Sequence, residues 1–298
     1  MSAVAYWPAP ESRTVRVGEF GVSLIEQGEG SPLLFLHGGG PGCHGWSDFG
    51  PVVPEFAVDH RCIVVDLLQY GHSDKPPIVE PVWSFHARHL VALLDELGVD
   101  RVDLACSSWG GSAGLCLAAE HPDRVGAVVV TGSMPVRHGA LAPLPEGLAG
   151  TGPGRGKTAR DDYYGGDGPT MEKMRVLMAR YEWFDASLIP EETVRARYEL
   201  SIAEDERRLY TEGVDRGAPQ DLSGHLRSIR APVLFIWGMH DAFLPPDYAL
   251  MLANMVPDGH LHVMARAAHH LEEERPAAYA AVVRAFLASE GLHERREW

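Results

Sequence analysis

Residues 101–114, RVDLACSSWGGSAG, carry the pattern that most narrows the folds open to this chain. Alternating apolar residues predict a buried strand, small residues around Ser108 predict a tight turn, and a helical pattern begins near Trp109. Gly110 and Gly111 supply the small neighbours that a sharp strand-to-helix turn requires. The segment therefore predicts a buried strand that passes directly into a helix.

Ser108 lies at the tip of this predicted turn. A serine on such an elbow projects Oγ above the sheet, while the next backbone N–H points at a developing oxyanion. A literal Gly-x-Ser-x-Gly match, at residues 110–114, selects Ser112 instead, about one helical turn later. We reject Ser112, because a hydroxyl inside a helix more often bonds back to a carbonyl oxygen. An ordinary turn serine is the alternative interpretation of Ser108.

Strand and helix patterns alternate along the rest of the chain. Short apolar runs predict strands at residues 14–19, 22–27, 33–37, 62–66, 101–106, 125–131, 232–237 and 261–264. Helical patterns include residues 83–97, 109–121 and 277–289. This alternation predicts an α/β fold with a mostly parallel central sheet flanked by helices.

About a hundred residues separate the predicted strands at 125–131 and 232–237, too many for a simple crossover connection. We therefore predict one core, formed by residues 1–135 and 223–298, with an inserted helical cap, or lid, at residues 136–222.

Within this predicted insertion, residues 139–169 are rich in glycine, proline and charge. Such a segment buries little apolar surface, so we expect a mobile loop or lid hinge there, with a plain disordered linker as the alternative. Residues 171–181 and 191–209 instead predict amphipathic helices.

Two candidate partners for Ser108 follow it in the chain. The strand pattern PVLFIW leads into a loop that contains Asp241, and the next predicted strand leads to His269. Both would emerge at the carboxyl edge of the sheet, where open α/β sheets hold their chemistry. Asp241 would fix the tautomer of His269, which would take the proton of Ser108 and later return one to the leaving group. The adjacent His270 and His240 are competing candidates for the base.

The non-catalytic interpretations of these two residues are a solvated turn acid for Asp241 and a surface helix cap for His269. The order serine, acid, histidine at the ends of successive predicted strands favours the catalytic interpretation.

A second loop could complete the site. Residues 33–42, LLFLHGGGPG, predict a strand followed by a glycine-rich loop whose backbone N–H groups can approach a substrate oxygen. Gly39 and Trp109 are the candidate N–H donors. The loop lacks a Gly-Lys-Ser/Thr ending and no Gly-x-Gly-x-x-Gly opens a helix here, so nucleotide binding is disfavoured.

These blocks resemble the α/β-hydrolase superfamily, and most of all the meta-cleavage-product hydrolases, which cleave carbon–carbon bonds of dienol keto acids. The resemblance covers most of the chain except about residues 136–170. It rests on HGGGPG with GWSDF, on Asp66 through YGHSDK, on SWGG at the elbow, on WGMHDAF at the acid, on His269, and on LIPEETVRARY in the cap.

The resemblance implies a substrate-binding role for Arg197, because the family's arginine contacts the keto-acid end of the substrate. A guanidinium suits that task, since its planar fork binds a carboxylate bidentately. The alternative is a helix-surface arginine paired with Glu192 or Glu199. Four further residues fall where the resemblance implies contact with substrate: Gly38, Gly40, Asp48 and His270.

The chain also departs from this family. Cys106 and Ala268 replace glycines, His270 stands where the family usually has tryptophan, and Asp48 replaces an asparagine beside the oxyanion loop. An acid at that position disfavours an anionic dienolate unless it is neutralised. Because residues 108–112 also resemble the elbow of the proline iminopeptidases, amide and ester substrates remain open.

Composition excludes several other classes. With 26 basic and 41 acidic residues the net charge is −15, so nucleic acid and anionic membranes are poor partners. No apolar run reaches a transmembrane length and no cationic, apolar leader begins the chain, which predicts a cytoplasmic protein. The four cysteines predict free thiols. We expect no metal and no cofactor, and the resemblance suggests a homodimer.

Together these features predict a serine hydrolase of a small molecule, with a meta-cleavage-type keto acid as the leading substrate class. An ester, lactone or amide is the alternative, because it needs the same nucleophile but no dienol-binding arginine. A catalytically silent ligand-binding protein on the same fold is a remote third interpretation.

Overall fold

The structure, a computed structural model, describes residues 6–136 and 155–293. Its main element is an eight-stranded sheet in the order β1-β2-β4-β3-β6-β7-β9-β10. The strands are β1 (Arg13–Val17), β2 (Phe20–Gln27), β3 (Ser31–Leu36), β4 (His60–Val65), β6 (Val102–Ser107), β7 (Val125–Thr131), β9 (Val233–Gly238) and β10 (Gly259–Met264). Each predicted strand overlaps one of these strands, with ends that differ by about two residues at most.

The strand order creates a natural place for a site. β2 is antiparallel to β1 and β4, whereas the other neighbouring strands are parallel. The chain adds β4 on one side of β3 and then crosses over to add β6 on the other side. The carboxyl ends of β3 and β6 therefore flank a reversal of strand order, where open α/β sheets bind their ligands.

Helices cover both faces of the sheet. One face carries α3 (Val82–Glu96), α4 (Ser108–Glu120) and α9 (Pro246–Ala253); the other carries α1 (Gly45–Phe49), α2 (Val53–Phe56), α10 (Leu271–Glu274) and α11 (Pro276–His293). Val233 and Phe235 of β9 pack with the first set, and Leu234 and Ile236 with the second, because successive strand residues point to opposite faces. The predicted α/β fold class is confirmed.

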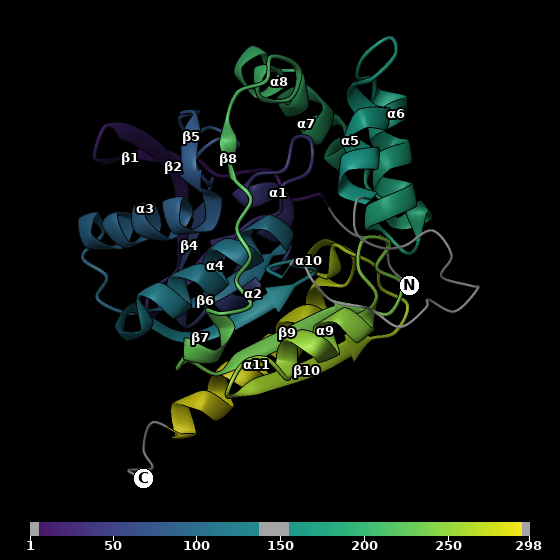
Figure 1. Cartoon of the computed structure of the whole chain (residues 1–298). Helices are drawn as coiled ribbons and strands as arrows, with labels where there is room; N and C mark the ends of the chain where they lie inside the picture. Colours follow the sequence, from purple (N-terminus) through teal and green to yellow (C-terminus); the bar gives the residue numbers. More distant parts are fainter. Residues whose placement is uncertain (1–5, 137–154, 294–298) are drawn as a thin grey trace.

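A second group of elements lies between β7 and β9. It comprises α5 (Arg155–Tyr164), α6 (Met171–Leu177), a π-helical turn (Met178–Glu182), α7 (Glu191–Ser201), α8 (Glu204–Thr211) and β8 (Arg216–Ala218), which we call the cap. Figure 1 shows α5 to α8 grouped on one side of the sheet. β8 pairs with β5 (Ile78–Pro81). Short 3-10 turns complete the described elements at Pro122–Arg124, Ala186–Leu188 and Leu226–Ser228.

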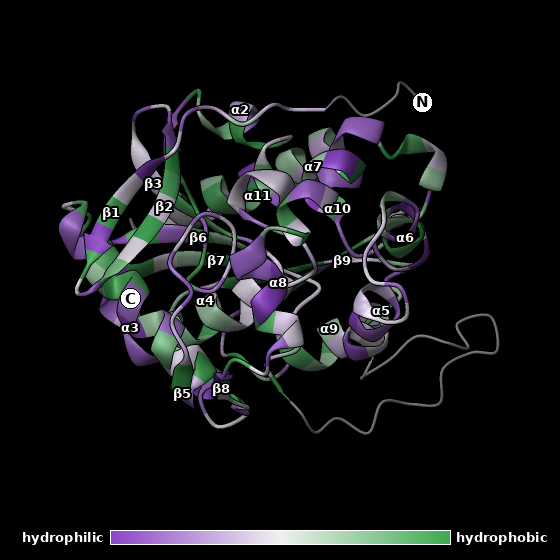
Figure 2. Cartoon of the chain, turned by 90° about the horizontal axis from the view of Figure 1, so that it is seen from above, coloured by the Kyte–Doolittle hydropathy of each residue, from purple (hydrophilic) through white to green (hydrophobic). Residues whose placement is uncertain are grey.

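Two predictions for the cap are wrong in part. The loop expected at residues 139–169 contains α5, because Ala159 and Tyr163 are buried in the cap's own apolar cluster; residues 137–154 lie outside the described residues. The single helix expected at residues 191–209 is divided into α7 and α8. Ser201 ends α7 with a hydrogen bond from its hydroxyl to the Tyr198 carbonyl, 2.7 Å long. α8 is mostly hydrophilic, as its purple colour in Figure 2 shows.

Candidate active site

Ser108 occupies a sharp turn between β6 and α4. Its φ is 47°, in the left-handed region that residues with a Cβ rarely adopt. The turn fits only because its neighbours are small: a Cβ on Gly110 would lie 2.2 Å from the Leu36 carbonyl oxygen. The Gly110 N–H donates to the His37 carbonyl at 2.9 Å and so ties the elbow to the glycine-rich loop. The sequence thus folds into the elbow that residues 101–114 predict.

Asp241 and His269 meet at the carboxyl ends of β9 and β10. His269 Nδ1 lies 2.8 Å from Asp241 Oδ2, and both side chains are buried. The other oxygen, Oδ1, accepts the N–H groups of Phe243 and Leu244 at 2.8 and 3.0 Å. Since a carboxylate can only accept, Nδ1 carries the proton, which leaves the Nε2 lone pair free to act as a base.

The surroundings of His269 fix its ring in place. A Cβ on Gly132 would lie 2.5 Å from His269 Cε1, so only glycine fits beside the ring. The Phe243 ring packs against it at a centroid distance of 4.5 Å. The backbone N–H of His269 donates to the backbone carbonyl of Glu182, at the end of the π-helical turn, at 3.0 Å. The core and the cap therefore both hold this imidazole.

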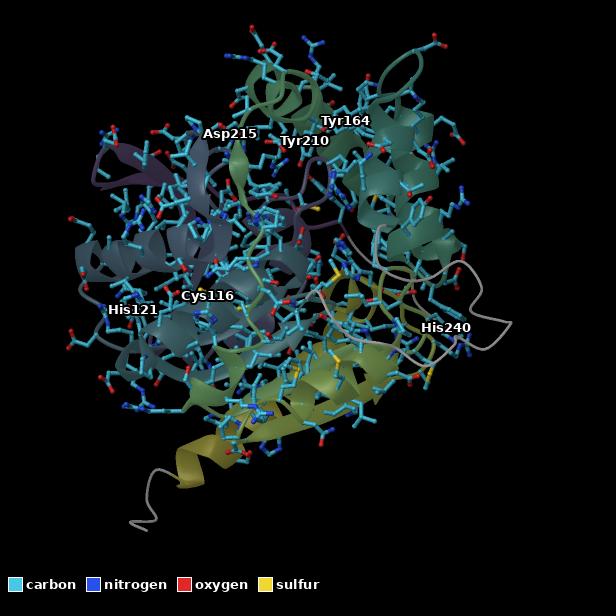
Figure 3. The ribbon with its side chains drawn as sticks, in the orientation of Figure 1. Cys116, His121, Tyr164, Tyr210, Asp215 and His240 are labelled. Carbon is cyan, nitrogen blue, oxygen red and sulfur yellow. The ribbon has the colours of Figure 1, made fainter. Side chains whose placement is uncertain are left out.

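The structure separates the rival candidates from this arrangement. Ser112 lies inside α4 and shares a hydrogen bond with the Ser133 hydroxyl, 2.9 Å long. His240, which is labelled in Figure 3, is exposed, and its ring packs against Phe184. His270 pairs with Glu273 rather than with Asp241. Of the three histidines, the one hydrogen-bonded to Asp241 is His269.

The glycine-rich loop lies beside the elbow. Trp109 is the second residue of α4, so its N–H has no acceptor within the helix. A Cβ on Gly39 would lie 3.0 Å from Trp109 Cβ, which brings the two candidate N–H donors together. Asp48 holds this loop, because its Oδ2 accepts the Gly38 N–H at 2.7 Å. Asp48 is fully buried, and its contact with substrate stays a prediction.

His270 supplies a positive charge beside this acid. Burial alone would lower the pKa of His270, but the carboxylates of Glu182 and Glu273 raise it to about 10. Burial would likewise raise the pKa of Asp48, yet His270, His37 and Arg197 lower it. An imidazolium thus lies beside a carboxylate at two of the four positions where the chain departs from its resembled family.

The same residues form the one group, within the described parts of the chain, whose geometry could hold a metal ion. Ligand atoms of Asp48, His270 and Glu273 lie within 4.8 Å of one another, and all three residues are buried. Because the raised pKa of His270 keeps its ring protonated at neutral pH, a metal would have to displace that proton. The imidazolium itself provides the cation of this cluster.

Arg197 is buried beside the glycine-rich loop. It is not a surface residue paired with Glu192 or Glu199, since its side chain is fully buried and forms an ion pair with Glu182. Its Nη2 also donates to Glu182 Oε1 at 3.1 Å and to the Pro41 carbonyl at 3.0 Å. Every nitrogen of the guanidinium therefore has an acceptor, and its role in substrate binding stays a prediction.

A cavity of 580 Å³ opens above Ser108 and His269, a size that suits a small-molecule ligand. Ser108, His269, His270, Gly39 and Gly40 are on its wall, whereas Gly38, Asp48 and Arg197 are not. Most of the remaining wall is apolar or aromatic and includes Trp83, Trp109, Met134, Leu177, Phe243 and Leu244.

Two further expectations can be compared with the structure. All four cysteines are buried free thiols, as predicted. Within the described part of the chain, none of the helices combines the length and the apolar character needed to cross a lipid bilayer.

Comparison with known proteins agrees with the fold. A family model for the alpha/beta hydrolase fold matches residues 31–276. The 2-hydroxymuconate semialdehyde hydrolase of Pseudomonas sp. (strain CF600) is 31% identical, over 89% of this chain and 90% of that protein. The 2-hydroxy-6-oxo-6-phenylhexa-2,4-dienoate hydrolase of Burkholderia cepacia is 31% identical, over 93% of this chain and 96% of that protein.

Solved structures extend the likeness. The meta-cleavage product hydrolase CumD of Pseudomonas fluorescens IP01 matches with a TM-score of 0.76 at 22% identity, covering 93% of this chain and 97% of CumD. The carboxylesterase CesB of Bacillus subtilis matches with a TM-score of 0.76 at 21% identity, covering 95% and 93% of the two chains. The chain belongs to the α/β-hydrolase family. It is a hydrolase of this fold, and its resemblance to the meta-cleavage product hydrolases is confirmed.

Proposed function

We propose that this chain is a serine hydrolase in which Ser108 is the nucleophile, His269 the general base and acid, and Asp241 the residue that orients His269. The hydrogen bond between His269 Nδ1 and Asp241 Oδ2, 2.8 Å long, carries this proposal. It leaves the basic Nε2 for Ser108, whose strained turn lines the same cavity. The N–H groups of Gly39 and Trp109 then bind the oxyanion.

The proposed substrate is a 2-hydroxy-6-oxo-dienoate or a related keto acid. The substrate in the name of the Burkholderia cepacia relative has no ester or amide bond, and its C6 carbonyl has carbon on both sides. Hydrolysis of such a molecule breaks a carbon–carbon bond. Asp48 repels an anionic substrate less here, because the His270 imidazolium places a positive charge beside it.

In the proposed reaction, Ser108 Oγ bonds to the C6 carbonyl carbon as His269 Nε2 takes the hydroxyl proton. The carbonyl electron pair moves onto oxygen, which Gly39 and Trp109 hold. The substrate reacts as its 2-oxo tautomer, in which the proton of the C2 hydroxyl has moved to C5. When the C6 carbonyl re-forms, the bond between C5 and C6 breaks, its electron pair passes through the conjugated C3–C4 double bond onto the C2 oxygen, and the His269 imidazolium protonates that oxygen. Water, deprotonated by His269, then releases the acyl group from Ser108 as a carboxylic acid.

A panel of substrates tests the bond type. Purified protein would receive 2-hydroxy-6-oxo-6-phenylhexa-2,4-dienoate, p-nitrophenyl butyrate and proline p-nitroanilide, with Ser108→Ala in parallel. We expect loss of the dienol absorbance with release of benzoate and a five-carbon dienoate, all abolished in Ser108→Ala. Hydrolysis of the ester or the anilide without the keto acid would refute the carbon–carbon assignment and favour the corresponding alternative.

A further inference from the structure

The proposed substrate needs a cation on the cavity wall, and Arg197 does not line that wall. The substrate class proposed above carries a carboxylate, and a buried anion needs a positively charged partner. The Arg197 guanidinium binds Glu182 and the Pro41 carbonyl, and Arg197 does not line the cavity. A cation on the wall itself is therefore better placed than Arg197 to hold this end of the substrate, if the proposed function is correct.

We propose that Arg160 of α5 binds the substrate carboxylate; this rests on the proposed function and deepens it. Arg160 lines the cavity together with Ala159, from the first element of the cap. Tyr164 lies one turn further along the same face of α5, and its ring stacks on Tyr210 of α8 at 4.8 Å, where Figure 3 labels both tyrosines. This face of α5 is thus held towards the interior of the cap.

The other charges on the wall are neutralised where they stand. Lys157 pairs with Asp161 at 2.5 Å, Glu182 pairs with Arg197, and His270 pairs with Glu273. Among the residues that the structure describes, Arg160 has no hydrogen-bond or ion-pair partner. One uncompensated positive charge therefore faces a largely apolar cavity, and a carboxylate fits it.

A second cation strengthens the positive field at this end. Arg216 of β8 donates to the Tyr70 hydroxyl at 2.5 Å, and its guanidinium lies 4.6 Å from the Tyr210 ring and 5.8 Å from the Trp109 ring. Burial raises the pKa of Tyr70 and of Tyr210, and the charges of Arg216 and Arg160 oppose that rise at both hydroxyls. The charges of both arginines therefore act on the same two tyrosine hydroxyls.

This placement also orients the substrate. Trp109 follows Ser108 directly, and its ring lies beside the Arg216 guanidinium. A carboxylate bound at Arg160, on the same cavity wall, therefore leaves the reacting carbonyl near the elbow. The group beyond the carbonyl then extends towards Met134, Phe243 and Leu244 on the apolar wall. Arg160 is in this account a binding and specificity residue, with no proton to move.

Binding of simple dienoates tests the proposal without any turnover. Calorimetry on full-length Ser108→Ala would compare 2,4-hexadienoate with the neutral 2,4-hexadienamide, and repeat both with Arg160→Gln, Arg160→Lys or Lys157→Gln added. We expect Arg160→Gln to weaken the carboxylate by about 10- to 100-fold and the amide by less than about 3-fold. Arg160→Lys should recover part of the loss, and Lys157→Gln should leave the ratio unchanged.

Two outcomes would overturn the assignment. One is equal affinity of the parent protein for the carboxylate and the amide; the other is an unchanged ratio in Arg160→Gln. Thermal melting of each variant separates loss of the site from loss of the fold. The two proposals can fail separately. If the keto acid is not hydrolysed but the carboxylate still binds more tightly than the amide in a way that requires Arg160, the carbon–carbon assignment is wrong and the anion site stands.

Discussion

Arg197 of α7 and Glu182 of the π-helical turn form an ion pair whose side chains are 0% and 3% exposed. The pair lies at a junction of four segments. Arg197 also binds the Pro41 carbonyl of the glycine-rich loop, and the Glu182 carbonyl accepts the N–H groups of His269 and His270. The contact therefore fastens the cap to both loops that carry the proposed chemistry.

Breaking this pair should cost more stability than removing it whole. Arg197→Met leaves the buried Glu182 without its guanidinium partner and with only the His270 ring 3.9 Å away, which we expect to lower the free energy of unfolding by about 3–5 kcal/mol. The double variant Arg197→Met, Glu182→Leu should lose markedly less. Urea unfolding of the four proteins measures both values. Equal losses in the single and double variants would contradict a pair that is buried and mutually dependent.

Asp241→Asn should separate orientation from structure. An amide in place of the carboxylate can donate to Nδ1 and favours the wrong tautomer of His269, so kcat should fall by about 10³–10⁴-fold. The far-UV circular dichroism spectrum should stay that of the wild type. Retention of more than a tenth of the activity would exclude Asp241 as the orienting acid.

Gly110→Ala tests the geometry of the elbow. The added Cβ would meet the Leu36 carbonyl oxygen at 2.2 Å, and because that atom belongs to the backbone of β3, relief requires the turn to shift. We expect a loss of stability of about 1–3 kcal/mol together with loss of activity. Gly98→Ala is the matched control: it lies in a turn with positive φ where nothing is within 4 Å, so it should cost stability but spare activity per folded molecule.

Glu206 gives the stability a pH dependence. Burial raises its pKa to about 7 from the usual value of 4.5, while Lys75 and Arg216 oppose the rise and Asp205 adds to it. Between these values the unfolded chain loses the proton and the folded chain keeps it. The contribution of Glu206 is thus complete below pH 4.5 and declines by roughly 3 kcal/mol as the pH rises to about 7.

Chemical unfolding at a series of pH values measures this slope. In Glu206→Gln the decline between pH 4.5 and 7 should be smaller than in the wild type, whereas the exposed neighbour variant Glu204→Gln should keep it. Identical slopes in all three proteins would contradict a protonated, buried Glu206.

The sequence predicts the sheet and the elbow well, because both depend on local patterns. The bounds of β7 are those expected, and Ser108 adopts the turn that its small neighbours imply. The sequence pattern of α7 and α8 is continuous and contains no glycine or proline between them, so the break after Ser201 depends on tertiary contacts: Tyr163 of α5 shares a hydrogen bond with the Ser201 hydroxyl.

The partners of the charged residues were the harder part of the site. Glu273 lies three residues after His270 at the start of a short helix, a spacing that could have indicated the pair. Glu182 carries no such signal, since it reaches Arg197 only through the π-helical turn. Long-range pairing of this kind is set by the packing of the cap on the core, which a single sequence does not encode locally.

The most direct test of the account is the identity of the nucleophile. The wild type, Ser108→Ala and Ser112→Ala would each react with a fluorophosphonate probe, and mass spectrometry of the peptides would map the labelled residue. The account predicts one adduct, on Ser108, in the wild type and in Ser112→Ala, and none in Ser108→Ala. An adduct on Ser112, or an unlabelled wild type that is folded, would contradict it.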